Sequence, residues 1–392
     1  MTEWKEYKLH EIGEIVGGAT PSTKNAENYD GNIAWLTPKD LSSFTERYIS
    51  KGERSITEQG YKSCSTRMLP KHSILFSSRA PIGYIAIAAN ELCTNQGFKS
   101  IIPNEKVDYL FLYYLLKYKK NDIAIMGSGT TFKEISGNVM KNIKISIPTD
   151  IEIQKRISNV LDKIDCKIEN NNAINRNLSE QANLYYEEWK QSVIGKKIEL
   201  SAVIDVRDGT HASPKAQEKG FPLVTSKHLL EYDVDLISPN KISQKDYDKV
   251  NERSKVDYHD VLMSMIGTVG LVSFVSRKKV NFAIKNVALF KTSQKQEFAY
   301  YLLMYLKSSE TQKYIKACLA GSTQQYISLA ELRKMPILVP NVDELVKFNA
   351  VAEPIIDLIC ANVKENQRLV QIRDILLPKL MSGELDVSKL DI

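Results

Sequence analysis

The stretch from Ile151 to Trp189, IEIQKRISNVLDKIDCKIENNNAINRNLSEQANLYYEEW, decides the architecture that we expect for this chain. Its apolar and small residues recur in alternating steps of four and three, which is the spacing of a coiled-coil seam. Asp150 is a suitable N-cap and Gly195 a suitable stop. The predicted helix would be on the order of 58 Å long, which is too long for one small core. Its seam residues are Ile157, Leu161, Ile164, Ile168, Leu178 and Ala182.

A second helix of the same kind starts near Asp343 and has the sequence DELVKFNAVAEPIIDLICANVKENQRLVQIRDILLPKL. Pro354 should bend this helix and Pro378 should end it, because proline lacks the N–H that helical hydrogen bonding needs. Its seam residues are Leu345, Ala352, Ile355, Ile359, Leu369 and Leu376.

Polar residues interrupt both seams near their middle. They are Asn171 and Asn175 in the first helix and Asn362 and Asn366 in the second. A buried Asn costs stability and fixes register, so we expect the two helices to pair with each other in a single alignment. The alternative is two ordinary amphipathic helices, each packed on its own domain.

The chain also repeats itself. ILFSSRAPIG from Ile74 corresponds to VLMSMIGTVG from Val261, and YYLLKY from Tyr113 corresponds to YYLLMY from Tyr300, both at an offset of 187 residues. GTTFKEISGNVMKNIKISIP at 129–148 corresponds to GSTQQYISLAELRKMPILVP at 321–340, an offset of 192. Several blocks in the same order at nearly constant spacing indicate an internal duplication.

Each copy is therefore a globular domain followed by a long helix. Short β-type runs mixed with the helical YYLL segment predict α+β domains, with Trp35 and the YYLL tyrosines in their cores. The second helix should run antiparallel to the first, which gives the two copies a pseudo-twofold relation. We expect a globular domain over residues 1–150, a central spacer helix over 151–195, a second globular domain over 196–341, and a C-terminal spacer helix with its tail over 342–392.

Composition narrows the class of protein. The N-terminal MTEWKEYKLHE lacks the apolar core of a signal peptide, and no run approaches the length of a membrane span, so we expect a cytoplasmic protein without membrane contact. The five cysteines are widely spaced, which predicts free thiols in a reducing compartment. The five histidines are equally dispersed, so the sequence predicts no metal site.

The net charge of +6 is distributed unevenly. It is +3 over residues 1–150, −1 over 151–195, +7 over 196–341 and −3 over 342–392. A basic surface attracts polyanions, so the two globular regions are the candidate nucleic-acid contacts and the helices are candidate protein contacts. A surplus of this size is also common on an ordinary solvated surface.

The sequence contains no convincing catalytic motif. Adenine methylation would need Asn or Asp followed by two prolines and an aromatic residue, yet none of the thirteen prolines is adjacent to another. The segment Gly127-Ser128-Gly129 is better explained as a turn than as a cofactor loop, and no GxxxxGK[ST] phosphate-binding motif occurs. We therefore expect no catalytic residue and no cofactor, and any use of ATP would belong to a partner.

The order domain, helix, domain, helix resembles the specificity subunit of type I restriction-modification systems. The resemblance is carried by GGATPST near the N-terminus, by GSGTTFKEIS and GSTQQYISLAEL, and by the PKLMSGEL tail, and it covers essentially the whole chain. It implies two target recognition domains, each recognising one half of a split double-stranded DNA site, and helices that set the gap. It also implies two docked adenine-N6 methyltransferase subunits, joined by ATP-dependent restriction and motor subunits.

The two copies differ where base contacts are expected. The first has Phe132-Lys133-Glu134 and the second Gln324-Gln325-Tyr326, as domains with different half-sites would. Polar and basic side chains near turns are the candidate DNA contacts, because they can neutralise phosphates or bind base edges, although many such side chains are merely solvated. The candidates are Thr20, Ser22, Lys24, Lys39, Arg79, Lys99, Thr130, Thr131 and Lys133 in the first domain, and His211, Lys215, Lys227, Lys285, Thr323, Gln324 and Gln325 in the second.

The alternative function is a coiled-coil adaptor whose globular ends bind proteins or RNA without recognising bases. Steep weakening of binding with salt, through counterion release, would favour DNA recognition over the adaptor.

Overall fold

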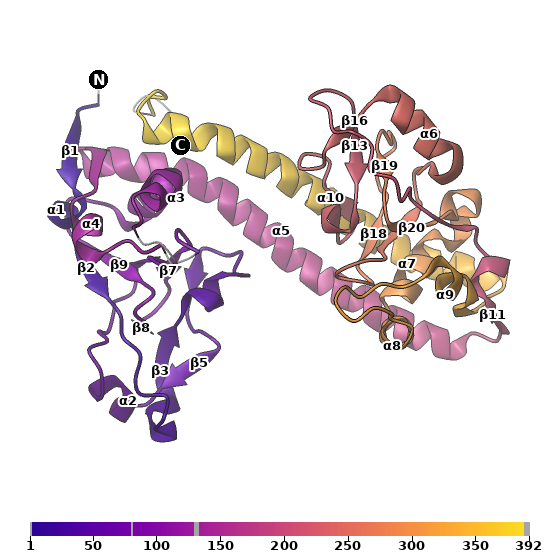
Figure 1. Ribbon diagram of the computed structural model, residues 1–392, viewed down its shortest axis with the longest axis horizontal. Coiled ribbons are helices and arrows are strands. Elements are labelled where there is room, and N and C mark those ends of the chain that lie inside the picture. The colour runs from indigo at the N-terminus through magenta and orange to yellow at the C-terminus, as the bar shows by residue number, and fades with distance from the viewer. Residues whose placement is uncertain (1, 80, 129–132, 388–392) are drawn as a thin grey trace. The chain divides into compact units, whose positions relative to one another are not determined.

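Figure 1 shows the computed structural model, which describes residues 2–79, 81–128 and 133–387. The chain divides into two compact units, of which unit 1 comprises Met1–Glu169 with Leu369–Ile392 and unit 2 comprises Asn170–Arg368. Two long helices, α5 (Ile151–Ser192) and α10 (Val342–Met381), contribute residues to both units. Each unit therefore contains a globular part of mixed helix and strand together with a portion of each long helix.

Unit 1 is built on a five-stranded sheet in the order β2-β9-β6-β7-β4. A three-stranded sheet, β5-β3-β8, and the pair β1-β10 complete its strands. The strands are β1 (Trp4–Lys8), β2 (Gly13–Gly17), β3 (Tyr29–Leu36), β4 (Tyr48–Ile49), β5 (Arg54–Ile56), β6 (Ile74–Phe76), β7 (Ile85–Ala88), β8 (Cys93–Thr94), β9 (Lys99–Pro103) and β10 (Lys144–Pro148). Its helices before α5 are α1 (Leu9–Ile12), α2 (Glu58–Lys62), α3 (Tyr109–Ile125) and α4 (Gly137–Lys141), with short 3₁₀ turns at Ala26–Asn28 and Pro38–Leu41.

Unit 2 repeats this arrangement with a four-stranded sheet, β12-β20-β17-β18, and a three-stranded sheet, β16-β13-β19. The strands are β11 (Lys197–Glu199), β12 (Val206–Asp208), β13 (Phe221–Val224), β14 (Leu229–Leu230), β15 (Asp233–Val234), β16 (Lys241–Ile242), β17 (Val261–Ser264), β18 (Val272–Phe274), β19 (Ala283–Ile284), β20 (Val287–Phe290) and β21 (Pro336–Leu338). Its helices before α10 are α6 (Gln244–Ser254), α7 (Ala299–Lys307), α8 (Ser309–Ala317) and α9 (Leu329–Lys334), and 3₁₀ turns lie at Leu200–Ala202, Ser226–His228, Thr292–Gln294 and Gln296–Phe298.

Strand pairing confirms the internal duplication. The pair β1-β10 corresponds to β11-β21, and both pairs are antiparallel. The parallel pair β3-β8 corresponds to the parallel pair β13-β19. The order β2-β9-β6-β7 corresponds to β12-β20-β17-β18, and unit 1 adds β4 at the edge. The fold is of the predicted α+β class, built twice.

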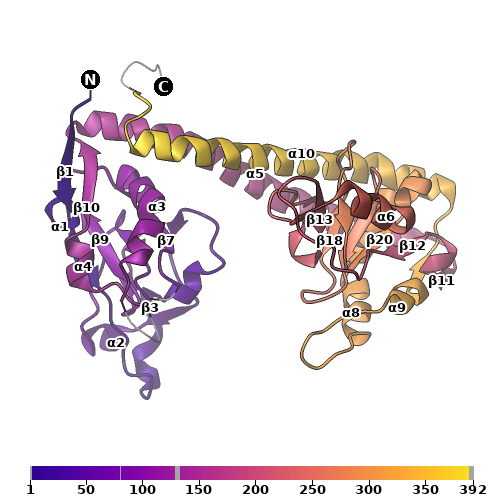
Figure 2. The ribbon, with the colours of Figure 1, turned by 45° about the horizontal axis from the view of Figure 1, so that its top comes forward.

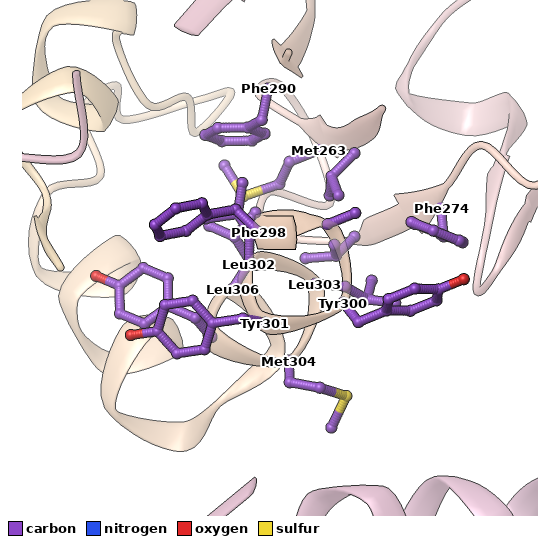
Figure 3. Close-up of a cluster of buried hydrophobic side chains, with 14 of the residues drawn as sticks. Met263, Phe274, Phe290, Phe298, Tyr300, Tyr301, Leu302, Leu303, Met304 and Leu306 are labelled. Carbon is purple, nitrogen blue, oxygen red and sulfur yellow. The ribbon is translucent and has the colours of Figure 1, made fainter. Parts of the chain in front are cut away.

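The YYLL segments form buried helices at the centre of each core. α3 places Tyr114 against the sheet of unit 1 with no exposed surface, and α7 does the same for Tyr301 of unit 2, which is 1% exposed. Figure 3 shows α7 of unit 2 surrounded by Phe290, Phe298 and Met263. The YYLL tyrosines of both units and Trp35, which is 4% exposed, are core residues as predicted.

The long helices pair side by side within each unit, as Figures 1 and 2 show. In unit 2, the Nδ2 of Asn171 donates to Oδ1 of Asn366 at 2.9 Å, and the Nδ2 of Asn362 donates to Oδ1 of Asn175 at 2.8 Å. Partner numbers fall in α10 as they rise in α5, so the helices are antiparallel. The predicted pairing and the role of its asparagines are confirmed.

The helix boundaries follow local chemistry. The Asp150 carboxylate accepts a hydrogen bond from the Glu152 backbone N–H at 2.8 Å, which caps the start of α5. The prediction that Pro378 ends the second helix is wrong, because α10 continues to Met381. Proline removes one N–H bond and crowds the carbonyl four residues earlier, but it does not stop the turns that follow, and α10 continues through Pro354 as well. The chain turns away just after Met381, at Gly383, which has a φ of +77°.

Seam side chains pack in the core of the unit to which they belong. Ile157 and Leu161 are buried in unit 1 beside Leu377 and Leu380 of α10. In unit 2 the buried seam residues are Ala182, Leu345, Ala352 and Ile359, with Leu178 and Ile355 partly buried against them. Ile164, Ile168, Leu369 and Leu376 are half-buried in unit 1.

Within the described ranges, no helix is both long enough and apolar enough to cross a membrane.

Candidate nucleic-acid interface

The sheet of unit 1 has two chemically different ends. Gly17 of β2 pairs with Lys99 of β9 at one end, where the chain enters polar loops, and this end is called the loop end. Gly13 pairs with Pro103 at the opposite, anchor end. Pro103 and Ile151 of α5 line a common cavity, so the anchor end faces the long helix. The loop end is the part of unit 1 that the helices leave uncovered.

The sheet of unit 2 has the same polarity. β12 runs from Val206 at its anchor end to Asp208 at its loop end. Arg277 follows β18 at the anchor end, where its Nη2 donates to Oε1 of Gln367 in α10 at 2.7 Å. Ser264 of β17 lies at the loop end and precedes a polar turn. Both units therefore present their loops away from their own portion of the helix pair.

The turn after β2 is the first element of the loop end in unit 1. Trp35 fixes it by donating from Nε1 to the Ala19 carbonyl at 3.1 Å. Gly18 has no room for a side chain, because a Cβ there would lie 2.1 Å from the Thr94 carbonyl oxygen. The Thr20 hydroxyl donates to the Gln96 side-chain carbonyl and ties the turn to the loop before β9.

A second cluster at the loop end of unit 1 surrounds Glu134. Arg79 Nε lies 3.1 Å from one carboxylate oxygen of Glu134, and Lys99 Nζ lies 3.7 Å from the other. Arg79 and Glu134 also form a backbone bridge, so the chain at these two residues comes together there. Two of the predicted DNA contacts thus share one carboxylate.

Other predicted contacts of unit 1 are placed separately. Lys39 pairs with Glu53 at 2.8 Å, and this hydrogen bond raises the pKa of the lysine. Ser22, Lys24 and Lys133 are exposed. Thr130 and Thr131 lie outside the described residues.

Unit 2 forms the equivalent turn with different side chains. Nδ1 of His211 lies 2.7 Å from Oδ1 of Asn286, and Nε2 lies 2.9 Å from the buried Asp208 carboxylate. Lys285 Nζ donates to the Ser213 hydroxyl at 2.5 Å. The His211–Asn286 contact takes the place of the Thr20–Gln96 contact of unit 1. The same backbone turn therefore carries different side chains in the two units.

The remaining predicted contacts of unit 2 are exposed. Lys215 lies after the His211 turn, and Lys227 lies in the 3₁₀ turn after β13. Thr323, Gln324 and Gln325 lie in the loop between α8 and α9. The Gln325 carbonyl accepts from the Gly267 N–H at 3.1 Å, which attaches this loop to the turn after β17.

Sequence reasoning missed four polar residues at these loop ends. Gln96 was detectable in principle, because Asn95-Gln96-Gly97 is a turn-type sequence. Asn286 had no local signal, although its φ of +54° is typical of a polar turn residue. Lys249 and Arg253 of α6 were missed because they lie in a segment with no counterpart of similar length in the first copy.

The chemistry of both loop ends suits binding. Hydroxyl, amide and cationic side chains can contact phosphates and base edges. Among the described residues there is no group of three or more His, Cys, Asp or Glu side chains arranged to hold a metal ion.

Comparison with known proteins agrees with this geometry. The family model of the type I restriction modification DNA specificity domain matches residues 1–180 and again 199–356. The chain is 34% identical over 419 residues to the type I restriction enzyme MjaIX specificity subunit of Methanocaldococcus jannaschii, covering 99% of this chain and 95% of that protein. It is 32% identical over 173 residues to the EcoR124I/EcoR124II specificity subunit of Escherichia coli, covering 42% of this chain and 41% of that protein.

The fold has also been seen in a solved structure. The crystal structure of the S subunit of a type I restriction-modification system from M. genitalium matches with a TM-score of 0.61 at 16% identity. The match covers 97% of this chain and 96% of that one.

Proposed function

The chain belongs to the DNA specificity subunits of type I restriction-modification systems, and from that premise we propose that it recognises a bipartite DNA duplex with one half-site per unit. The observation that carries the proposal is the pair of loop ends. Each lies at the corresponding end of the equivalent sheet in its unit, yet Thr20 and Gln96 of unit 1 are replaced by His211 and Asn286 in unit 2. One scaffold with two sets of donors and acceptors suits two different half-sites.

The segments of the chain have separate roles in this proposal. Residues 1–150 form the first target recognition domain and residues 196–341 the second, while 151–195 and 342–392 supply the spacer helices. The candidate base and phosphate contacts are those at the two loop ends. The recognised DNA site is asymmetric because the two domains present different side chains to its two halves.

The helix pair sets the gap between the half-sites and docks two methyltransferase subunits. Its pairing is rigid enough for a spacer, because Asn171 is 1% exposed and donates both to Glu365, at 2.7 Å, and to Asn366. Large apolar side chains that face solvent support docking, since exposed apolar surface marks protein contacts. They include Val346, Leu358 and Ile375 of α10 and Leu184 of α5, which are 47–64% exposed.

In this proposal the partner subunits carry out the catalytic steps. The docked subunits methylate adenine at N6, and restriction subunits with an ATP-driven motor join that core. The specificity subunit itself needs no catalytic residue and no cofactor, and it works in the cytoplasm, where the DNA is.

A matched pair of insertions tests the spacer role. One heptad inserted after Glu169 of α5 and another after Arg368 of α10 keeps the 3.5-residue seam and lengthens both helices by about 10 Å. At about 3.4 Å per base pair, the gap in the methylated motif should grow by roughly three base pairs. Sequencing of methylated genomic DNA measures this gap directly.

The control is a heptad inserted between Lys278 and Lys279, two exposed residues outside the helices. It should leave the gap unchanged. Intact methylation with the original gap in the helix variant would contradict the spacer role. Binding that is insensitive to salt and to duplex sequence would instead favour the adaptor function.

A further inference from the structure

Helix α6 is the main difference in architecture between the two loop ends. It spans Gln244–Ser254, whereas its counterpart α2 spans only Glu58–Lys62. Both helices follow the equivalent edge strand and begin with a hydroxyl N-cap, since Thr57 accepts from the Gly60 N–H and Ser243 from the Asp246 N–H. The residues from Lys249 onward are therefore additional to unit 2.

The added turns of α6 form one wall of a cavity. The cavity has a volume of about 290 Å³, and its lining includes Lys249 and Arg253 from α6 and Thr210, His211 and Ser213 from the turn after β12. The buried Asp208 carboxylate pairs with the Arg253 guanidinium and with His211. These two contacts hold α6 against the turn after β12. The opening thus adjoins the turn that carries predicted DNA contacts.

The two lysines of α6 are available to a ligand, whereas Arg253 is already paired with Asp208. Lys245, Lys249 and Arg253 follow each other at four-residue spacing on one exposed face, and together they are called the α6 basic stripe. Lys245 and Lys249 form no ion pair with any residue in the described part of the chain. The nearby Asp246 carboxylate accepts from the Ser243 hydroxyl at 2.7 Å, so it is already engaged at the helix start.

Unit 1 lacks this arrangement. Its cations at the loop end, Arg79 and Lys99, share the Glu134 carboxylate. A carboxylate within ion-pair distance of two cations cancels part of their attraction for phosphate. The α6 helix also carries carboxylates, at Asp246, Asp248 and Glu252, but none of them forms an ion pair with its two lysines in the described part of the chain.

We propose that the α6 basic stripe binds backbone phosphates of the DNA duplex beside the half-site of unit 2, and that unit 1 has no equivalent contact. This inference rests on the proposed function and adds to it. The ligand is a phosphodiester, because lysine is a point charge that neutralises phosphate without distinguishing bases. The contact therefore adds affinity and salt dependence on one side of the site and leaves the recognised sequence unchanged.

The test is the salt dependence of DNA binding by the full chain in complex with its methyltransferase subunits. The double variant Lys245→Gln, Lys249→Gln removes two phosphate contacts, and each contact contributes about 0.9 to the slope of log affinity against log salt. The slope should become shallower by roughly 1.8. The control Lys278→Gln, Lys279→Gln removes the same charge at the anchor end and should preserve the slope of the unaltered complex.

Two results would overturn the inference. One is an equal slope for the α6 variant and the unaltered complex, or an equal change in the control. The other is a methylated motif whose second half becomes less specific, because this would make α6 a base-reading element. Failure of the proposed function gives a different result, namely no preference of the unaltered complex for any duplex sequence.

Discussion

In unit 1 the turn after the first sheet strand is held by Thr20 and Gln96, whereas in unit 2 the same turn is held by His211 and Asn286. The cations beside the first turn share a carboxylate, while the α6 lysines beside the second have no ionic partner among the described residues. The sheets underneath keep the same strand order. The apolar pattern therefore preserves the scaffold, while the side chains at the loop ends are free to change.

The two units also differ in how they attach to the helix pair. In unit 1 Arg47 is 3% exposed, and its Nη2 lies 2.7 Å from the Glu169 carboxylate of α5, with Asp162 paired to the same guanidinium. In unit 2 the attachment through Arg277 is more open, since that side chain is 30% exposed. The attachment of unit 1 should therefore depend more strongly on one buried arginine.

The largest expected effect comes from Arg47→Met. Loss of a buried cation leaves its carboxylate partners without compensation, which typically costs about 3 kcal/mol. We expect the free energy of unfolding, measured by urea titration, to fall by about that amount. The control Arg67→Met breaks the exposed pair with Glu14 and should cost far less, because solvent screens an exposed ion pair. Equal losses would mean that Arg47 does not anchor unit 1.

Asn171→Ala tests the polar layer of the helix pair. It removes two hydrogen bonds in a buried environment and should lower the free energy of unfolding by about 2 kcal/mol. The control Asn177→Ala makes the same substitution at an exposed position of α5 and should stay within about 0.5 kcal/mol. Urea titration of both variants measures the contrast. An Asn171 variant with an unchanged free energy of unfolding would show that this residue does not fix the register of the helix pair.

Glu134→Gln should make unit 1 more like unit 2. It frees Arg79 and Lys99 from a shared carboxylate, so DNA affinity of the methyltransferase complex should rise about tenfold, or roughly 1.4 kcal/mol. Fluorescence anisotropy at fixed salt measures the change. Glu14→Gln is the matched control, because Glu14 also pairs with an arginine but lies on β2 near the anchor end. A gain shared by both variants would assign the effect to net charge alone.

The smallest effect concerns acid stability. Burial, with a further contribution from Lys227, lowers the pKa of His228 below its usual value of 6.5. A lowered pKa in the folded state means that protonation favours unfolding, so the stabilising contribution is complete above pH 6.5 and is lost as the pH falls through the folded-state pKa. His228→Asn should flatten the loss of unfolding free energy below pH 6.5. An unchanged pH profile would show that His228 does not titrate in this way.

The sequence contained enough information for the scaffold. Period 3.5 predicted both long helices, and asparagines on the two seams predicted their pairing, because one face of each helix must be buried along its length. The repeated blocks predicted a duplicated fold, because equivalent apolar residues must fill equivalent cores. The prediction for Pro378 was wrong because a proline disturbs one turn of a helix without ending it, and α10 continues through both Pro354 and Pro378.

The side chains that attach and distinguish the units were harder to foresee. Arg47 lies in a polar loop, and its partners Asp162 and Glu169 are more than 100 residues away, so no local pattern connects them. The segment of α6 has charges of both signs and few apolar residues, so its sequence has no clear helical periodicity. Neither the helix nor its basic stripe was therefore predicted. Such features depend on which loops meet in space, and a single sequence does not reveal this.

A chain with two copies of the first domain shows whether each unit recognises one half-site through its own loop end. Residues 196–341 are replaced by a second copy of residues 1–150, and the methylated motif is determined by sequencing host DNA. We expect a motif whose two halves are inverted copies of one half of the original motif. A motif that keeps two different halves would contradict this expectation.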